Sequence, residues 1–88
     1  MVFEEDQRRE IFQEYVEVLA DVREVNGITK RELAEIVGIH EKHVSHVENM
    51  RRIPSVETLL AMMAGAGVKK ELAEEFCTNL INKFKWKG

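Results

Sequence analysis

The sequence predicts a single all-α domain of five helices, and three observations lead to this expectation. The chain has 88 residues, a length at which one hydrophobic core is too small to divide between two folding units. Helix-favouring residues are abundant, and one proline and five glycines leave few helix breakers. Apolar residues recur at intervals of three and four, the period of an amphipathic helix. Residues 1–88 are therefore expected to form one domain.

Residues 4–25 predict one long amphipathic helix. Residues 4–6 are acidic and fall in its first turn, where carboxylates complement the positive end of the helix dipole. Asn26 and Gly27 predict its end. The apolar positions at helical spacing are Ile11, Phe12, Tyr15, Val16, Leu19 and Val22.

Two short helices with a tight turn between them are expected next. Thr29 and the glutamate three positions later have the capping-box arrangement that begins a helix, so the second helix should span residues 30–37. Gly38 suits the left-handed conformation that ends it. A third helix should follow over residues 41–49. Because the connection is so short, the two helices must cross at a steep angle, as in a helix-turn-helix unit over residues 30–49.

Six positions within this unit meet the packing needs of such a turn. Ala34 is small enough to let the third helix approach, and Gly38 can turn the chain. The angle between the helices is filled by apolar residues, namely Leu33, Ile39, Val44 and Val47. Several constrained positions at fixed offsets are a stronger signal than a single dipeptide motif.

Two more helices complete the expected fold. Ser55 should cap a fourth helix over residues 56–66, whose largely apolar surface predicts a core element. A fifth helix over about residues 69–85 carries large apolar residues at every fourth position. Its length predicts that it covers the first helix and also makes a two-fold dimer contact. The residues expected in that contact are Phe76, Leu80, Phe84 and Trp86.

The formal net charge of −3 argues at first against a nucleic-acid partner, because phosphate neutralisation supplies most non-specific affinity. The charge is unevenly distributed, however. Residues 1–29 carry eight acidic and three basic side chains, whereas residues 30–52 carry five basic and four acidic ones. Acidity is therefore concentrated in the first helix. His40, His43 and His46 can add positive charge to the middle segment below neutral pH.

Composition also bears on compartment and catalysis. Cys77 is the only cysteine and the sequence shows no secretory leader, so a reduced, cytoplasmic protein is expected. No apolar run approaches membrane-spanning length, so no membrane association is expected. Cys77 falls in the apolar stripe of the fifth helix, where a buried inert thiol is favoured over a nucleophile. Nothing else resembles an active site, and the chain is not expected to be an enzyme.

The three histidines invite a zinc hypothesis, which their spacing disfavours. His40, His43 and His46 would step around a helix by about 60° each time. They also lack carboxylate or thiolate partners at ligand spacing. A solvated polar face that meets DNA is favoured, with plain surface histidines as the alternative. No metal ion or other cofactor is expected.

The middle of the chain resembles the phage repressor and Cro type of helix-turn-helix proteins, the XRE-like regulators. The stretch ITKRELAEIVGI from Ile28 is similar to the family pattern LTQEELAEKLGIS, and VSHVEN from Val44 to ISRIEN. RRIPSVETLL from Arg51 is similar to KRNPSLETLL, and Gly67-Val68 to a closing GV. The resemblance covers about residues 19–68. It implies the five-helix lambda-repressor-like fold, with the third helix in the major groove of DNA.

The resemblance also implies roles for individual residues. Lysine donates to guanine acceptors, and glutamate can accept from the N4 amino group of cytosine. The expected base-reading side chains are Glu41, Lys42 and His46, with His40 and His43 beside them. The expected phosphate-contacting residues, which fix register without reading sequence, are Lys30, Asn49, Arg51 and Arg52. Arg23 and Glu48 match a structural ion pair of the family.

Two positions depart from the family pattern. Lys30 replaces a glutamine, which keeps a donor and adds charge but loses the ability to accept a hydrogen bond. Met50 replaces a glycine that follows the ISRIEN-like segment. A left-handed methionine costs about 1 kcal/mol, which makes Asn49 the alternative residue for that conformation.

Together these features predict a sequence-specific DNA-binding transcriptional regulator, in the form of a dimeric repressor that reads the major groove with its third helix. The expected partners are double-stranded DNA and a second copy of the chain. The alternative is a protein-interaction module on the same fold, such as an antitoxin or co-regulator, in which the acidic first helix or the fifth helix holds another protein. The two readings differ in duplex affinity, which should fall steeply with salt only for a DNA-binding regulator.

Overall fold

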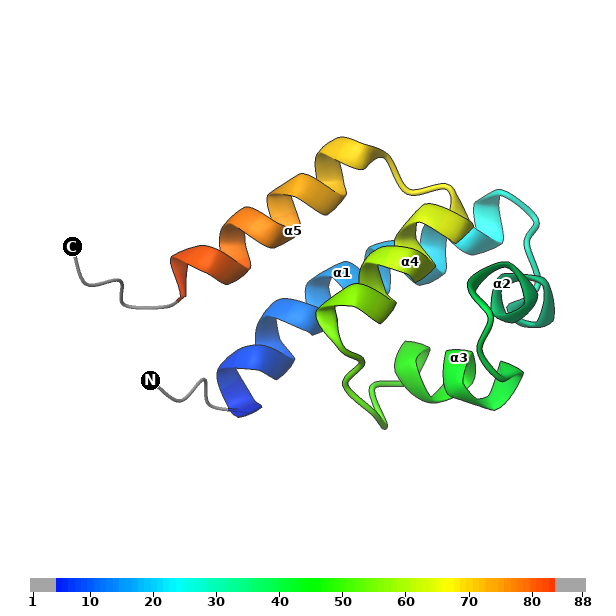
Figure 1. Ribbon diagram of the computed structural model, residues 1–88, viewed down its shortest axis with the longest axis horizontal. Helices are drawn as coiled ribbons and strands as arrows, with labels where there is room; N and C mark the ends of the chain where they lie inside the picture. The colour runs from blue at the N-terminus through cyan, green and yellow to red at the C-terminus, as the bar shows by residue number, and fades with distance from the viewer. Residues whose placement is uncertain (1–4, 84–88) are drawn as a thin grey trace.

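The computed structural model describes residues 5–83, which form five helices and no strand within that range (Figure 1). The helices are α1 (Glu5–Val25), α2 (Lys30–Val37), α3 (Glu41–Glu48), α4 (Val56–Ala66) and α5 (Lys70–Asn82). The predicted all-α, five-helix class is confirmed. Phe84 and Trp86 lie outside the described residues. α5 ends at Asn82 with Lys83 as its C-cap, earlier than the expected end at about residue 85.

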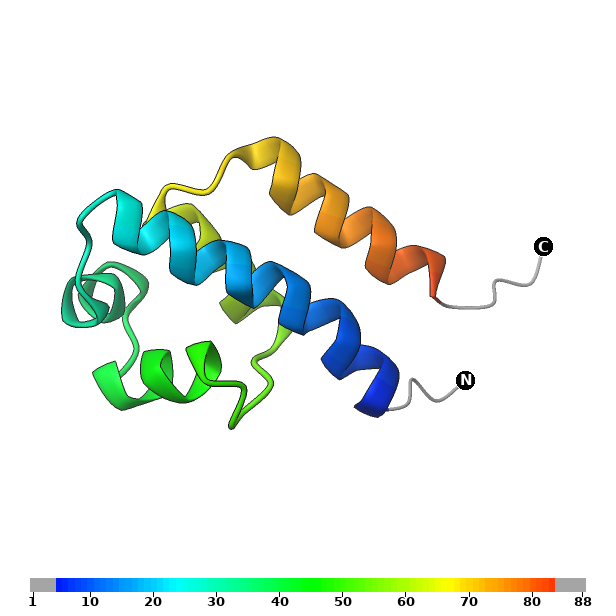
Figure 2. The same ribbon diagram turned by 180° about the vertical axis from the view of Figure 1, so that it is seen from behind.

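The helices are arranged with α1, α4 and α5 along the length of the molecule and with α2 and α3 at one end. α1 contacts α3, α4 and α5, and α2 packs on both α3 and α4. Figure 2 shows α1 from the opposite side, with α5 running beside it. The first turn of α1 and the last turn of α5 lie at the end away from α2 (Figures 1 and 2). The short helices α2 and α3 are therefore presented at the far end of the bundle.

Local capping explains where α2 and α4 begin and end. The side chain of Thr29 accepts the backbone N–H of Glu32, and the Glu32 carboxylate accepts the backbone N–H of Thr29 at 3.0 Å. This second hydrogen bond lowers the pKa of Glu32, because it stabilises the ionised carboxylate. Ser55 caps α4 through the backbone N–H of Thr58 at 3.1 Å. Gly38 at φ 84° ends α2, as the sequence predicts.

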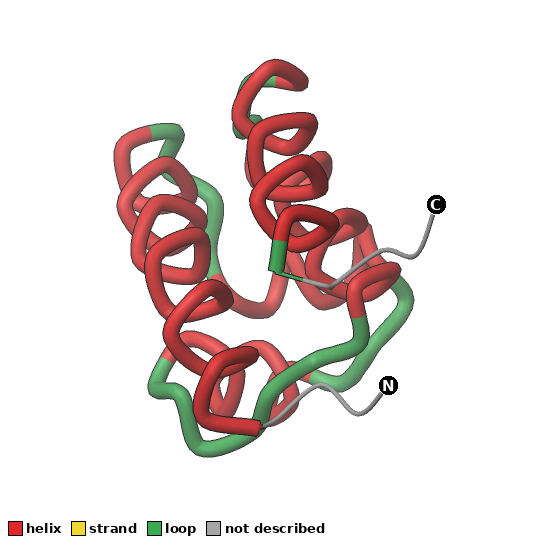
Figure 3. Tube along the Cα trace, turned by 90° about the vertical axis from the view of Figure 1, so that its left-hand side faces the viewer, coloured by secondary structure: helices red, strands yellow, loops and turns green. Residues whose placement is uncertain are grey.

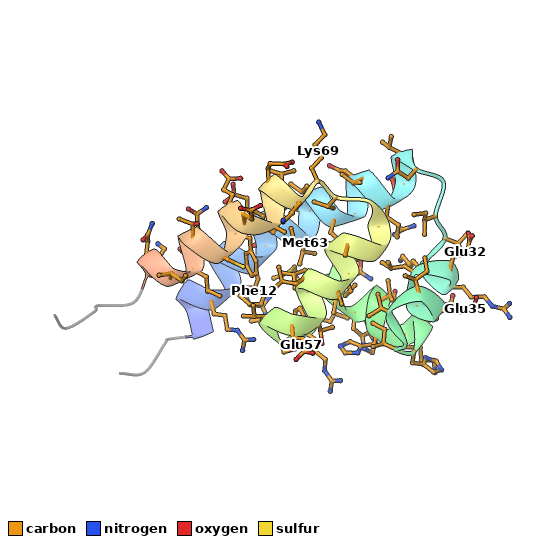
Figure 4. The ribbon with its side chains drawn as sticks, turned by 45° about the horizontal axis from the view of Figure 1, so that its top comes forward. Phe12, Glu32, Glu35, Glu57, Met63 and Lys69 are labelled. Carbon is orange, nitrogen blue, oxygen red and sulfur yellow. The ribbon has the colours of Figure 1, made fainter. Side chains whose placement is uncertain are left out.

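All five helices contribute buried side chains to one core. Phe76 of α5 packs edge-on against Phe12 and Tyr15 of α1, with ring centroids 5.2 and 5.0 Å away, a favourable aromatic geometry. In Figure 4, Phe12 and Met63 point inward, whereas Lys69 points away from the molecule. The side chains that are fully buried are Phe12, Tyr15, Val16, Leu19, Leu33, Val44, Val47, Leu59, Met62, Met63 and Phe76.

This packing corrects one part of the expected dimer contact. Phe76 is 0% exposed, so its ring belongs to the core and does not meet a second copy. Apolar residues at every fourth position of α5 predict one continuous stripe. Within that stripe, Phe76 is buried against α1 and is not available to a partner. Leu80 is half-buried and packs against the same core.

Gly65 allows α2 to lie close to α4. A Cβ at this position would lie 3.0 Å from Cδ1 of Leu33 and 3.1 Å from Cγ2 of Ile36. The lack of a Cβ on Gly65 therefore allows α2 to approach α4 more closely than another residue at this position would.

None of the helices formed by residues 5–83 combines the length and the apolar character needed to cross a bilayer.

Candidate nucleic-acid interface

The helix-turn-helix unit begins with the packing of α2 on α3. Leu33 and Ala34 of α2 and Val44 and Val47 of α3 are all buried. They are four of the six positions expected to meet the packing needs of the tight turn. Because Val44 and Val47 occupy the inner side of α3, Glu41, Lys42 and His46 are left on its exposed side.

The outer side of α3 carries most of the expected base-reading residues. Glu41, Lys42 and His46 are exposed, and His43 is half-buried. His40 differs from them, because it lies before the helix and its side chain turns back as the N-cap. Its Nδ1 accepts the backbone N–H of Lys42 at 3.0 Å. The structure therefore brings the other four together on α3 and gives His40 a capping contact within the protein.

Lys30 connects the beginning of α2 to this surface. Its Nζ lies 3.4 Å from Oγ of Ser45, a long hydrogen bond across the two helices. An open hollow of about 430 Å³ lies at this junction. Its lining residues are Lys30, His40, Glu41, Lys42 and Ser45. A lysine at the start of α2 is thus held beside α3.

The loop after α3 carries the other expected phosphate contacts, and Asn49, Arg51 and Arg52 are all exposed. Met50 adopts the left-handed conformation at φ 56°, whereas Asn49 has φ −90°. The expectation that Asn49 would take this role is wrong. The backbone N–H of Arg51 donates to the carbonyl of His46 at 2.8 Å, a closure of the helix end that requires the reversal at Met50.

Two arginines of α1 hold this loop through hydrogen bonds that were not expected from the sequence. Arg8 donates to the carbonyl of Pro54 at 2.7 Å, and Arg9 donates to the carbonyl of Met50 at 2.9 Å. The Arg8 guanidinium also lies 4.8 Å from the centre of the Phe12 ring. Figure 3 shows the loop, in green, next to the beginning of α1. Their partners are more than 40 positions away along the chain, so no local pattern indicates them.

Arg23 and Glu48 form a buried ion pair between α1 and α3. Arg23 Nε lies 2.6 Å from Glu48 Oε2, and Arg23 Nη2 lies 3.0 Å from Oε1, a bidentate geometry. Only 8% and 6% of the two side chains are exposed. Arg23 also donates to the carbonyl of Ile28 at 2.7 Å. The hydrogen bonds that Arg23 donates to the Glu48 carboxylate raise the pKa of Arg23, although burial opposes this. The pair fixes α3 relative to α1 and to the turn before α2.

The described residues contain no group of three or more histidine, cysteine or acidic side chains that could hold a metal ion. His43 and His46 share α3, but His40 directs Nδ1 to the backbone.

Comparison with known proteins identifies the family. A helix-turn-helix family model matches residues 19–72, which is more than half of the chain. Searches of curated proteins and of solved structures each found no match. The matched region contains α2, α3 and α4, together with the Arg23 and Glu48 pair described above. The chain therefore belongs to the XRE-type helix-turn-helix family of DNA-binding regulators.

Proposed function

We propose that the protein is a sequence-specific transcriptional regulator that inserts α3 into the major groove of DNA. The observation that supports this most directly is the two-sided character of α3. Val44 and Val47 anchor its inner side in the core, and the exposed Glu41, Lys42 and His46 occupy the opposite side. A helix held in this way can present its side chains to base edges without losing its own packing.

Cationic residues at both ends of the unit support the same orientation. Lys30 lies at the first turns of α3, and Arg51 and Arg52 follow its last turn. We assign phosphate contacts to these three residues and to Asn49. Contacts on both sides of a recognition helix set its register on the duplex, and they compensate locally for the acidic α1.

The regulator is further proposed to act as a homodimeric repressor on an inverted repeat. A two-fold dimer presents two copies of α3 to half-sites about one helical turn apart. Leu80, Phe84 and Trp86 remain the candidates for the contact after Phe76 is assigned to the core. Repression requires only that the bound dimer occupy the site that another protein needs.

The test is selection of bound duplexes from a random pool, followed by titration of the selected site at several salt concentrations. The expected result is a defined, two-fold symmetric sequence, with affinity that falls linearly on logarithmic axes as salt rises. Random duplexes of the same length serve as the control and should bind more weakly. Equal binding to selected and random duplexes would contradict sequence-specific recognition.

The second candidate is a protein-interaction module on the same fold. Val25 and Ile36 favour it, because their side chains are 85% and 61% exposed and both are large and apolar. Val25 is the last residue of α1, and Ile36 lies on α2. This function predicts little duplex affinity at any salt concentration, so the titration above separates the two candidates.

A further inference from the structure

We propose that His40 is a pH-dependent positioning residue, whose neutral ring caps α3 and whose protonated ring releases the first turn of that helix. His40 has the extended backbone of an N-cap, with φ −78° and ψ 145°. Its Nδ1 accepts the backbone N–H of Lys42 at 3.0 Å. This N–H is one of those that the first turn of a helix leaves without a partner in the helix itself.

The chemistry of imidazole makes this cap conditional. A neutral ring has one nitrogen that accepts and one that donates, so the contact to Lys42 requires the proton to be on Nε2. A protonated ring has two donors and no acceptor. It therefore cannot accept the Lys42 N–H, and the cap is lost.

The other capped helices show the contrast. Thr29 caps α2 and Ser55 caps α4 with hydroxyl oxygens, which do not titrate in the physiological range. α5 begins without a side-chain cap. Among the described helix starts, α3 is thus the one whose capping atom can take up a proton.

Charged side chains line the hollow that His40 shares. The groups that share the hollow with His40 are Lys30 from α2 and Glu41 and Lys42 from α3, with Ser45 as a neutral neighbour. Two cations and one anion therefore line the same hollow as His40, which lies at the positive end of the α3 dipole. A proton on His40 would add positive charge there and would remove the acceptor on which the cap depends. The stabilisation from the cap is present at high pH and is lost as pH falls.

The consequence for DNA recognition rests on the proposed function. The turn that His40 caps contains Glu41 and Lys42, two of the proposed base-reading residues. Loss of the cap would loosen these side chains. His43 and His46 act in the opposite sense, because their protonation would strengthen contact with phosphates. His40 therefore limits how far acidification can strengthen binding.

The experiment compares three forms of the full chain in the absence of DNA, namely the parent, His40→Ser and His40→Ala. Serine keeps a cap that does not titrate, and alanine removes the cap. The equilibrium constant for unfolding is measured by urea titration at pH 7.5 and 5.5, and every form retains the other two histidines. The parent is expected to match His40→Ser at pH 7.5. Between pH 7.5 and 5.5 its unfolding constant should rise by about fivefold relative to that of His40→Ser, which corresponds to the loss of one cap.

Nitrogen-15 spectra of the histidine rings give an independent readout. At pH 7.5 they should show His40 protonated on Nε2, and the Lys42 amide should exchange with solvent faster at pH 5.5 in the parent than in His40→Ser once exchange rates are corrected for pH. The inference would be overturned if the unfolding constants of the parent and His40→Ser changed by the same factor between pH 7.5 and 5.5. A His40 ring protonated on Nδ1 at pH 7.5 would also overturn it.

Duplex titration of the same proteins separates this inference from the proposed function. If DNA binding occurs, affinity should increase more on acidification for His40→Ser than for the parent. An equal increase in both would overturn the effect on recognition. If no form binds any duplex, the proposed function is refuted, while the stability and spectroscopic results still decide whether His40 is a titrating cap.

Discussion

At the scale of single residues, the Arg23 and Glu48 pair allows a sharp prediction because the chain also contains an exposed pair. Replacing Glu48 by alanine leaves the Arg23 guanidinium buried without its anion, which should lower the free energy of unfolding by about 3–5 kcal/mol. Arg31 and Glu35 are 78% and 70% exposed and 3.5 Å apart. Glu35→Ala should cost no more than about 0.5 kcal/mol. Urea denaturation of both variants tests the contrast, and similar midpoints for the two would contradict it.

A second prediction separates base reading from phosphate contact. Lys42→Ala and His46→Ala should each lower affinity for the selected site by about 1–3 kcal/mol while changing affinity for random duplexes less. Arg52→Ala should weaken binding to all sequences alike and reduce the salt dependence. Competition binding on selected and random duplexes measures both. Equal losses on the two duplexes for all three variants would contradict the assigned roles.

Residue-level prediction from the sequence succeeds where the cause is local. Thr29 and Gly38 act within a few residues of their own positions, so their spacing is enough to identify them. The left-handed conformation of Met50 cannot be predicted in this way. Its energetic cost is local, whereas the contacts that compensate for it come from distant residues. The carbonyl of Met50 accepts from Arg9 and its side chain packs against the core. Local cost alone favours Asn49 for the left-handed conformation, because it takes no account of these distant contacts.

At the scale of elements, the contact of α2 with α4 depends on Gly65. Gly65→Ala would gain about 1 kcal/mol in helix propensity, but its Cβ would lie 3.0 Å from Cδ1 of the fully buried Leu33, a contact that requires the surrounding core to shift. Overpacking of this kind costs about 1–3 kcal/mol, so a net loss of about 1 kcal/mol in unfolding free energy is expected. Thermal or urea unfolding measures it. Ala61→Gly, at an exposed position of the same helix, gives the propensity term alone. A more stable Gly65→Ala protein would show that α2 can shift.

The pH dependence of DNA binding is the next element-level prediction, and it concerns α3. Phosphates close to a histidine favour its charged form, so binding should tighten as pH falls. Each proton taken up on binding raises affinity by up to about tenfold per pH unit. His46 is the first candidate carrier, because it is exposed, and the half-buried His43 is the second.

The measurement is duplex titration at pH 7.5 and 6 for the parent and for His43→Gln and His46→Gln. The salt dependence should steepen at the lower pH, since more phosphates are neutralised. Unchanged affinity of the parent over this window, or a full pH response in both variants, would show that these histidines do not meet phosphate.

At the scale of the whole molecule, the sequence predicted the number, order and approximate bounds of the helices, because each has its own periodicity and capping residues. It could not predict which apolar residues on α5 face α1 and which remain for a partner. That division depends on how the Phe76 ring fits between Phe12 and Tyr15. The hydrogen bonds from Arg8 and Arg9 to the loop after α3 could not be predicted either. Both arise from contacts between distant segments that helical periodicity does not encode.

The last prediction concerns assembly. Removing residues 84–88 keeps every described helix but deletes Phe84 and Trp86. If these side chains make the two-fold contact, the shortened protein should sediment as a monomer where the full chain is a dimer. It should also bind its operator more weakly, because the two half-sites are no longer engaged by one linked particle.

Phe76→Leu is the matched control for this prediction. It changes an apolar side chain of α5 that lies in the core, so it should lower the unfolding free energy by about 1 kcal/mol and leave association unchanged. Sedimentation equilibrium over a range of protein concentrations distinguishes the two variants. A full chain that remains monomeric at high concentration would rule out the dimer, and a shortened chain that still dimerises would move the contact to another surface.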